Sequence, residues 1–301
     1  MMNDNTEIRL LSESLVDELV GSVGLPKTRF THWLFWHMFR RVTDRFSRIG
    51  APFDRLVGKQ GLPAASDWCL THFCTNIQSR GNEHIPAQGP LLVAANHPGA
   101  YDALVFFSQL KREDILWIST EIPFLRLLPN TRGHILFTSR TDAQNRMLVM
   151  RQAVQHLRSG GTLVYFAAGH RDPDPAVFPG ASTSIDNWLD VFDSFTKYVP
   201  GLQILPAIAS GMVSDKWARH FLVKLRRKQI DRHRLAEFGQ VISQLLRPGK
   251  FFLSPTVSFG KALLAEELKM TSPDGRVRSA LIPEARQLLR QHMMEFNRQY
   301  S

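Results

Sequence analysis

Cysteine is scarce in this sequence: Cys69 and Cys74 are the only two among 301 residues. So few cysteines exclude a disulfide scaffold, and a chain of this length buries roughly three quarters of its unfolded surface without covalent staples. His72 lies between the two cysteines, which would suit a metal site, but the sequence places no second group of ligands nearby. We therefore expect two thiols packed in the core, and we expect no metal centre.

Long hydrophobic runs are absent as well. No segment reaches the ~18 uninterrupted apolar residues that span a bilayer. The polar residues 1–5 lack the basic-then-apolar order of a signal peptide, so the sequence predicts a cytoplasmic protein. Acidic residues are fewer than basic ones, 27 against 37, which gives a formal net charge of +10. This excess of positive charge favours a polyanionic partner, with phospholipid and nucleic acid as the two candidates.

The hydrophobic fraction of 44% and the charged fraction of 21% are typical of a soluble globular protein and exclude a disordered or collagen-like chain. Three regions differ in their pattern. Residues 1–80 have apolar positions at helical spacing, and residues 81–260 alternate short strand-like runs with helical stretches. After residue 261 the pattern is helical again, and Pro283 is predicted to lie in the first turn of a helix.

The middle region contains short apolar runs bounded by turn residues, at 90–95, 115–118, 134–138, 162–166, 202–209 and 256–259. They are continuous rather than alternating, which is typical of strands buried on both faces of a largely parallel sheet. A helix is predicted over residues 142–158, with Thr141 as its N-cap. The sequence thus predicts an α/β fold with a mixed, largely parallel central sheet flanked by helices, an N-terminal helical segment and C-terminal helices.

The heptapeptide Asn96-His97-Pro98-Gly99-Ala100-Tyr101-Asp102 directly follows the first of these runs, and a helix is predicted after it. Ligands of α/β sheets collect at the carboxyl ends of the strands, so this position favours chemistry. Pro98 and Gly99 favour a turn that brings the Asp102 carboxylate back to one ring nitrogen of His97. The other ring nitrogen is then free to take a proton. The alternative for so short a pattern is a turn histidine, with Asp102 only capping the helix.

This stretch resembles the opening of the glycerolipid acyltransferases, the family that contains the glycerol-3-phosphate and lysophosphatidic acid acyltransferases. The similarity begins at Gly81 and includes the His97-x4-Asp102 motif. Further segments resemble the family's later blocks in the same order, at residues 133–140, 166–171, 205–207 and 257–261. The resemblance implies an acyltransferase domain over residues 81–268. Residues 1–80 would be an N-terminal helical, membrane-associating region, and residues 269–301 a C-terminal helical extension.

The resemblance also implies an activity: transfer of a fatty acyl group from acyl-CoA or acyl-carrier protein to the hydroxyl of a glycerophospholipid-type acceptor such as lysophosphatidate. His97 would be the general base and Asp102 would orient it, with no metal or organic cofactor. The implied substrate-binding residues are Asn96, Gly99, Arg140, Gly169 and Arg171. The two arginines each follow a strand run, and a guanidinium suits bidentate recognition of a phosphate.

The block at residues 166–171 departs from the family pattern. Ala167 and Ala168 stand where the family has proline and glutamate, and His170 stands where it has threonine. The family's glutamate is associated with holding the acceptor, so its loss puts the acceptor's identity in question more than the base. The departure also leaves open a second hypothesis, a non-catalytic or repurposed lipid-binding relative.

Two stretches, residues 29–46 and 216–234, combine aromatic with basic side chains. If the first is a helix, one stripe contains Phe30, Trp33, Leu34, His37 and Arg41, and a second contains Phe35, Phe39, Val42 and Phe46. We expect one stripe to pack on the protein and the other to contact lipid, the alternative being a helix buried between two others. The second stretch is either a solvated helical face or a site for anionic headgroups. Because no zinc-finger spacing or helix-turn-helix is recognisable, we expect an anionic membrane surface as the partner, and no nucleic acid.

Overall fold

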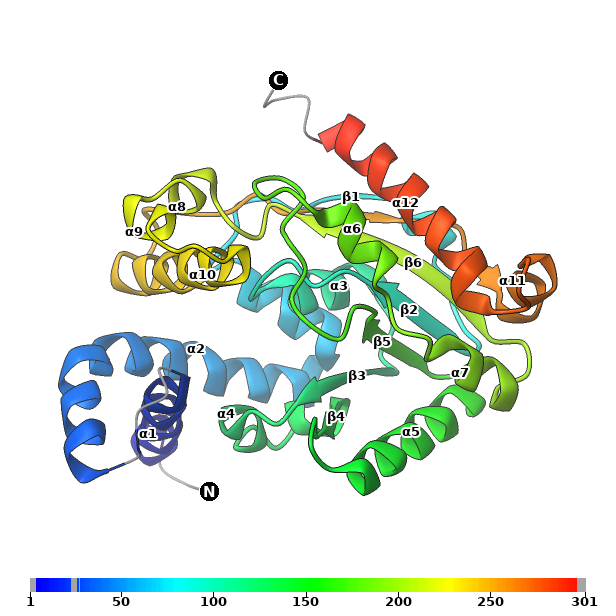
Figure 1. The fold of residues 1–301 in the computed structure, drawn as a ribbon. Coiled ribbons are helices and arrows are strands. Elements are labelled where there is room, and N and C mark those ends of the chain that lie inside the picture. The colour runs from blue at the N-terminus through cyan, green and yellow to red at the C-terminus, as the bar shows by residue number, and fades with distance from the viewer. Residues whose placement is uncertain (1–3, 23–25, 27, 297–301) are drawn as a thin grey trace.

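The computed structural model describes residues 4–22, 26 and 28–296, so residues 1–3 of the polar N-terminus lie outside the described residues. Within this part of the chain, one eight-stranded sheet forms the centre of the molecule (Figure 1). Its strands are β1 (Gln78–Arg80), β2 (Leu91–Ala95), β3 (Ile115–Thr120), β4 (Ile135–Thr138), β5 (Thr162–Phe166), β6 (Gln203–Ser210), β7 (Thr256–Phe259) and β8 (Leu263–Leu264). The order is β1-β7-β6-β2-β5-β3-β4, with β8 paired to β6.

All neighbouring strands run parallel except the pairs that β6 forms with β7 and with β8. This confirms the predicted mixed, largely parallel sheet. Each of the six predicted runs is a strand, with ends shifted by two residues or fewer. The strands β1 and β8 were not predicted, because three polar residues and two leucines carry no strand pattern of their own.

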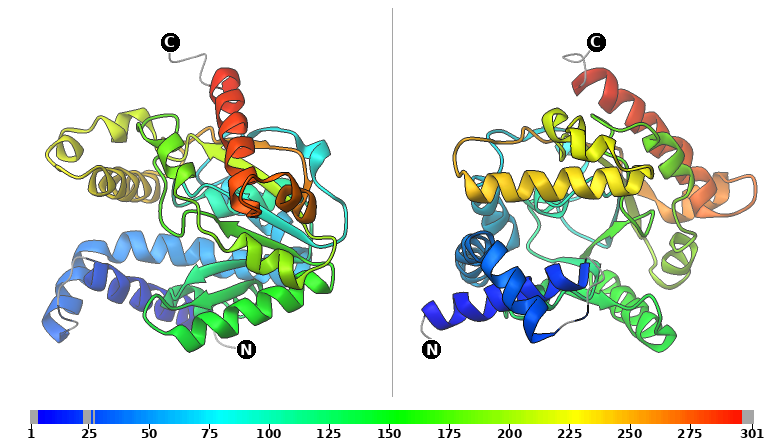
Figure 2. Two further views of the ribbon diagram at one scale, coloured as in Figure 1. Left: turned by 45° about the vertical axis from the view of Figure 1, so that its right-hand side comes forward. Right: turned by 60° about the vertical axis from the view of Figure 1, so that its left-hand side comes forward.

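The central strand β2 is buried along its whole length, and its alternate side chains enter two different cores. Leu91, Val93 and Ala95 belong to the core shared with α2 (Arg29–Leu70), α3 (Asp102–Leu110) and α10 (Gln229–Leu246). Leu92 and Ala94 belong to the core shared with α5 (Ala143–Arg158), α7 (Phe192–Tyr198) and α12 (Val277–Phe296). Helices therefore cover both faces of the sheet, as Figure 2 shows from two sides.

The N-terminal region is helical, as predicted. α1 (Asp4–Ser22) packs along the first half of α2, and Thr28 caps α2 in a capping box with Thr31. Shorter helices complete the fold: α4 (Pro123–Arg126), α6 (Ala181–Asp186), α8 (Asp215–Ala218), α9 (Phe221–Lys224), α11 (Ala265–Thr271) and the 3-10 turns Asn82–His84 and Thr131–His134. None of the described helices is both long and apolar enough to cross a bilayer.

Two predicted helix starts are wrong. Pro283 is the seventh residue of α12, which begins at Val277 because the Asp193 carboxylate on α7 accepts the Val277 N–H at 3.1 Å. The N-cap of α5 is Asp142 rather than Thr141, since its Oδ1 accepts the N–H groups of Gln144 and Asn145 at 2.9 and 3.1 Å.

The two cysteines are free and buried, as predicted. Both lie in the core between α2 and the sheet. Burial disfavours the charged thiolate and raises the pKa of each thiol to about 12. Cys69 and Cys74 therefore act as small apolar side chains at neutral pH.

Candidate active site

The predicted turn connects the carboxyl end of β2 to α3. It brings the Asp102 carboxylate back to His97, where Oδ2 accepts a hydrogen bond from the ring Nδ1 at 2.7 Å. The Asp102 side chain is 1% exposed and that of His97 is 27% exposed, so the imidazole faces solvent from a buried support. Among the described residues, no group hydrogen-bonds to the Nε2 of His97. The geometry thus presents one free ring nitrogen at the carboxyl edge of the sheet.

The Asp102 carboxylate accepts hydrogen bonds both from the start of α3 and from His97. Its Oδ1 accepts the Ala103 N–H at 2.6 Å, and its Oδ2 also accepts the Gly99 N–H at 3.0 Å. Because a carboxylate only accepts hydrogen bonds, the proton of a neutral His97 must lie on Nδ1. The two alternatives for this motif, a helix cap and an oriented histidine, therefore apply to the same side chain.

The last residue of β5 fixes the ring of His97, and the loop after β5 fixes its backbone. The Phe166 ring stacks on the imidazole with a centroid distance of 4.3 Å. The Asp172 Oδ2 accepts the His97 N–H at 2.6 Å, and the Asp172 N–H donates to the His97 carbonyl at 2.9 Å. Burial raises the pKa of Asp172, against the hydrogen bonds it accepts from the Ser184 hydroxyl and the His97 N–H. Asp172 thus positions the backbone of His97 and does not touch its ring.

A second buried carboxylate, Asp174, joins this loop to the turn after β6. It accepts the N–H groups of Ala176, Gly211 and Val213 at 3.0, 3.0 and 2.8 Å. Burial raises its pKa to about 6, and these hydrogen bonds oppose the shift. Sequence reasoning did not assign a role to either aspartate. A signal was present, because two carboxylates spaced two residues apart follow a buried strand.

Three of the predicted substrate-binding residues have structural roles near the His97–Asp102 dyad: Asn96, Gly99 and Gly169. The Asn96 amide bonds the backbone of Ala209 on β6 in both directions, at 2.9 and 2.8 Å. A Cβ on Gly99 would lie 2.6 Å from the Cβ of Met212, so glycine permits the β2 and β6 turns to meet. Gly169 has φ +67°, a left-handed conformation that glycine adopts without strain.

The two predicted phosphate-binding arginines lie apart. Arg171 is half-buried, forms an ion pair with Glu237 on α10, and its charge interacts with that of Asp102. Burial lowers the pKa of Arg171. Arg140 is exposed at the end of the edge strand β4, three strand positions or about 14 Å from β2. The structure therefore groups Arg171 with His97 and leaves Arg140 at the far end of the same edge.

Helix α10 supplies the other side of the site, which sequence reasoning missed. The His233 Nε2 donates to the carbonyl of Pro98 at 2.8 Å, and the Gln240 Nε2 donates to the carbonyl of Met212 at 2.8 Å. Gln244 accepts the Tyr101 hydroxyl at 2.9 Å. Burial and the charge of Arg171 lower the pKa of His233 to about 4, so it is neutral at physiological pH. The signal was a polar stripe at helical spacing, residues 233, 237, 240 and 244.

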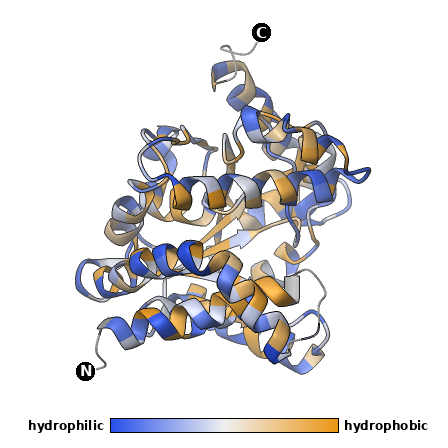
Figure 3. Cartoon of the chain, turned by 90° about the vertical axis from the view of Figure 1, so that its left-hand side faces the viewer, coloured by the Kyte–Doolittle hydropathy of each residue, from blue (hydrophilic) through white to orange (hydrophobic). Residues whose placement is uncertain are grey.

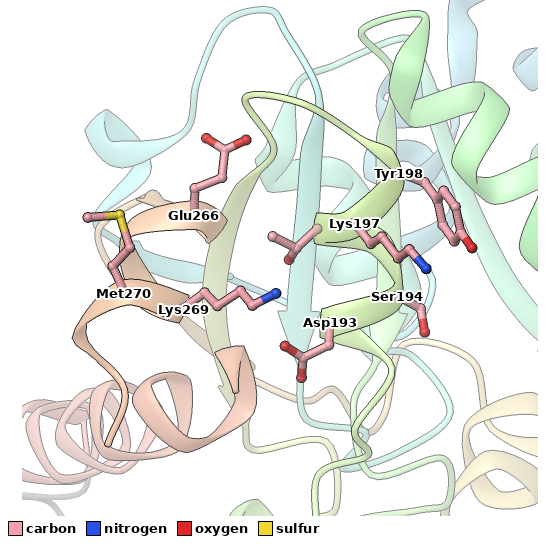
Figure 4. Close-up of a pocket in the computed structure, with 8 residues that line it drawn as sticks. Asp193, Ser194, Lys197, Tyr198, Glu266, Lys269 and Met270 are labelled. Atoms are coloured by element: carbon pink, nitrogen blue, oxygen red, sulfur yellow. The ribbon is translucent and has the colours of Figure 1, made fainter. Parts of the chain in front are cut away.

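A groove of about 590 Å³ lies elsewhere, between α7 and α11. It is lined by Asp193, Ser194, Thr196, Lys197, Tyr198, Glu266, Lys269 and Met270 (Figure 4). These elements flank the start of β6, where Ala265 donates to the carbonyl of Leu202 at 2.9 Å. The groove is therefore at the amino edge of the sheet, opposite His97.

One comparison with known protein families matches the middle of the chain. A family model described as Acyltransferase matches residues 76–207. The chain is similar to a solved structure described as the 1-acyl-sn-glycerophosphate (LPA) acyltransferase, PlsC, from Thermotoga maritima, with 15% identity, a TM-score of 0.41, and coverage of 97% of this chain and 100% of that chain. No curated protein matches the chain. Residues 76–207, the part of the chain that is similar to this family model, contain His97, Asp102 and Arg171.

Proposed function

We propose that this protein transfers a fatty acyl group from an acyl thioester to a hydroxyl of a glycerophospholipid-type acceptor, with His97 as the general base. The observation that carries the proposal is the His97–Asp102 hydrogen bond of 2.7 Å at the carboxyl end of β2. It holds the imidazole with Nδ1 occupied and Nε2 free, within the residues that the Acyltransferase family model matches.

The reaction proceeds in two proton transfers. Nε2 of His97 removes the proton of the acceptor hydroxyl while that oxygen attacks the thioester carbonyl, and Asp102 stabilises the resulting imidazolium. The tetrahedral intermediate then collapses, the carbon–sulfur bond breaks, and the imidazolium returns the proton to the leaving thiolate. Such general-base help contributes about 10²–10⁴-fold to the rate, so positioning of the two substrates supplies much of the remainder.

Thiol release tests this function. Purified protein is incubated with long-chain acyl-CoA or acyl-carrier protein and a panel of lysolipids, and free thiol and acylated product are both measured. Thiol release should depend on the presence of an acceptor with a free hydroxyl. A lipid-binding, non-catalytic relative would bind the lysolipids and release no thiol.

We predict that Arg171→Lys raises the KM for phosphate-bearing acceptors about tenfold, because a charge-assisted bidentate contact is lost while the Glu237 carboxylate keeps a cation. Arg140→Ala should raise the same KM by a smaller factor, since Arg140 is exposed and distant from β2. Slow hydrolysis of the thioester should persist in both variants. Arg158→Ala, an exposed change on α5, is the control, and an unchanged KM in Arg171→Lys for every phosphorylated acceptor would rule out this role.

We also propose that the protein binds anionic membranes peripherally through residues 29–46, at the start of α2, and residues 216–234, which include α9 and the loop before α10. The first stripe of α2 is exposed, with Phe30 at 67%, Trp33 at 56% and Leu34 at 37%, and Met38 beside it is 61% exposed. The second stripe packs on the protein, where Phe39 contacts Phe238 of α10 with ring centroids 6.2 Å apart. Figure 3 shows this side of the molecule, along which hydrophobic and hydrophilic residues mix. Apolar side chains beside basic ones suit the interface of an anionic bilayer.

Co-sedimentation with liposomes tests the membrane proposal. Replacing Phe30, Trp33 and Met38 by serine should remove the salt-resistant part of binding, because less apolar surface enters the interface. Changing Arg226, Arg227 and Lys228 to glutamate should remove the salt-sensitive part. The control replaces Met147 and Leu148, which are exposed on α5, by serine. Equal recovery from neutral and anionic liposomes would contradict the electrostatic contribution, and no recovery from either would contradict the whole proposal.

A further inference from the structure

Within the described part of the chain, only one of the two carboxylate oxygens of Glu237, on α10, has a partner. Its side chain is 8% exposed, and Oε2 forms the ion pair with Arg171. Oε1 is buried and has no hydrogen-bond partner among the described residues. A buried carboxylate oxygen without a donor is costly, because the water it loses on folding is not replaced. This oxygen therefore has capacity for one donor that the fold does not supply.

The position of Glu237 ties this oxygen to the proposed active site. Four residues earlier on the same face of α10, His233 donates to the carbonyl of Pro98 at 2.8 Å, which places Glu237 about 6 Å further along the helix axis. Arg171, the ion-pair partner, interacts electrostatically with Asp102 of the dyad. The charges of Arg171, Asp102 and His97 all act on His233 as well, so these groups form one cluster. The Glu237 carboxylate is thus linked to the turn of His97 through its ion pair with Arg171 and through His233, one helical turn away.

The charges around Glu237 restrict what the donor can be. Arg234, three residues before Glu237, is exposed, and its positive charge lowers the pKa of Arg171. Two guanidinium charges, one paired with the carboxylate and one three residues away on the same helix, therefore act on this region, and an ammonium donor meets repulsion from both. A neutral O–H on a ligand that also carries an anionic group meets none, because the anion is attracted by the same two arginines.

We propose that Glu237 Oε1 is a hydroxyl subsite, which accepts a hydrogen bond from an acceptor hydroxyl other than the one that is acylated. This inference rests on the proposed function, and it specifies the acceptor as an anionic polyol with at least two free hydroxyls. Arg171 keeps the carboxylate ionised and oriented, and the second hydroxyl fixes which oxygen of the acceptor reaches Nε2 of His97. Glu237 is in this sense a specificity-determining residue.

Equilibrium binding tests the subsite without requiring turnover. Isothermal titration calorimetry compares glycerol 3-phosphate with propane-1,2-diol 1-phosphate, which carries the same phosphate and one hydroxyl less. Wild-type protein should bind the first ligand about tenfold to hundredfold more tightly, the usual range for a hydrogen bond to a charged group. Glu237→Ala should reduce this preference to about twofold or less, while leaving the affinity for the analogue within about threefold.

A control and a second variant separate the subsite from a structural role. Thr131→Ala removes a buried hydrogen bond of 2.7 Å to Asp54 on α2, before the edge strand β4 and away from Arg171, so it should lower the melting temperature and keep the preference. Glu237→Asp keeps the charge but shortens the side chain, and should retain only part of the preference. If wild type binds both ligands equally, or if Glu237→Ala keeps the full preference, the subsite is refuted. Binding preference without thiol release would retain the subsite and refute the transferase, and thiol release without preference would do the reverse.

Discussion

Replacing His97 with alanine is expected to lower kcat for acyl transfer by about 10²–10⁴-fold and to leave the fold intact. The loss is large because Nε2 of His97 is the group that takes the acceptor's proton in the proposed mechanism. His233 also contacts this turn but cannot replace His97, because it donates its Nε2 hydrogen to the Pro98 carbonyl and has a pKa of about 4. Thiol release at saturating acceptor measures this effect.

The fold of the His97→Ala variant should survive because the turn has other supports. The Asp172 carboxylate still accepts the N–H of residue 97, and the Asp102 carboxylate still caps α3. His97→Gln is the matched control: it retains a side-chain donor for Asp102 and has no titratable nitrogen, so it should be as inactive as alanine. Wild-type turnover in both variants, with unchanged melting temperatures, would remove His97 from the mechanism.

The fold was largely predictable because its signals are local. Buried parallel strands produce continuous apolar runs, and β2, β5 and β7 begin or end within one residue of the predicted bounds. The errors lie where a long-range contact decides the structure. α12 starts at Val277 because of Asp193, and β1 exists only because β7 pairs with it. No pattern within either segment encodes its partner.

Of the candidate site, the turn with His97 and Asp102 was predictable from the sequence, and the contribution of α10 was not. A turn of Pro98 and Gly99 is enough to bring Asp102 to His97, so the motif encodes its own geometry. The contribution of α10 depends on tertiary packing across about 135 residues of chain, from Pro98 to His233. The basic charges of residues 216–234 predicted a segment at the surface, and the short helices α8 and α9 lie there. The polar stripe that begins at His233 is instead buried against the catalytic turn.

This arrangement bears on the altered block at residues 166–171. Ala168, which stands where the family has glutamate, is 3% exposed and packs in the core. This position therefore presents only a buried methyl group, with no carboxylate for a ligand. Glu237, from a different element, places a carboxylate against Arg171 instead. The chemistry beside Arg171 is therefore fixed by two segments of chain, and the departure from the family pattern does not leave the arginine without an acidic partner.

Asp102→Asn is expected to reduce kcat nearly as much as His97→Ala, by about 10²–10³-fold. The two carboxylate oxygens of Asp102 accept three hydrogens, from His97 Nδ1, Gly99 N and Ala103 N. An asparagine has one oxygen and one NH₂, so either orientation sets two donors against each other. When the NH₂ faces His97, the ring accepts at Nδ1 and its proton moves to Nε2. The nitrogen that should take the acceptor's proton is then already protonated.

The nitrogen chemical shifts of His97 distinguish this mechanism from a loss of structure. In wild-type protein at a pH where the ring is neutral, nitrogen-15 NMR should report a protonated Nδ1 and a bare Nε2, and Asp102→Asn should reverse the two. Asp142→Asn is the matched control, because Asp142 caps α5 by accepting two backbone N–H groups and lies outside the dyad. Since asparagine caps helices as well as aspartate, this control should change neither kcat nor the melting temperature. An Asp102→Asn variant that keeps the wild-type tautomer and still loses activity would show that Asp102 acts by stabilising the imidazolium charge alone, and one that keeps full activity would separate Asp102 from catalysis.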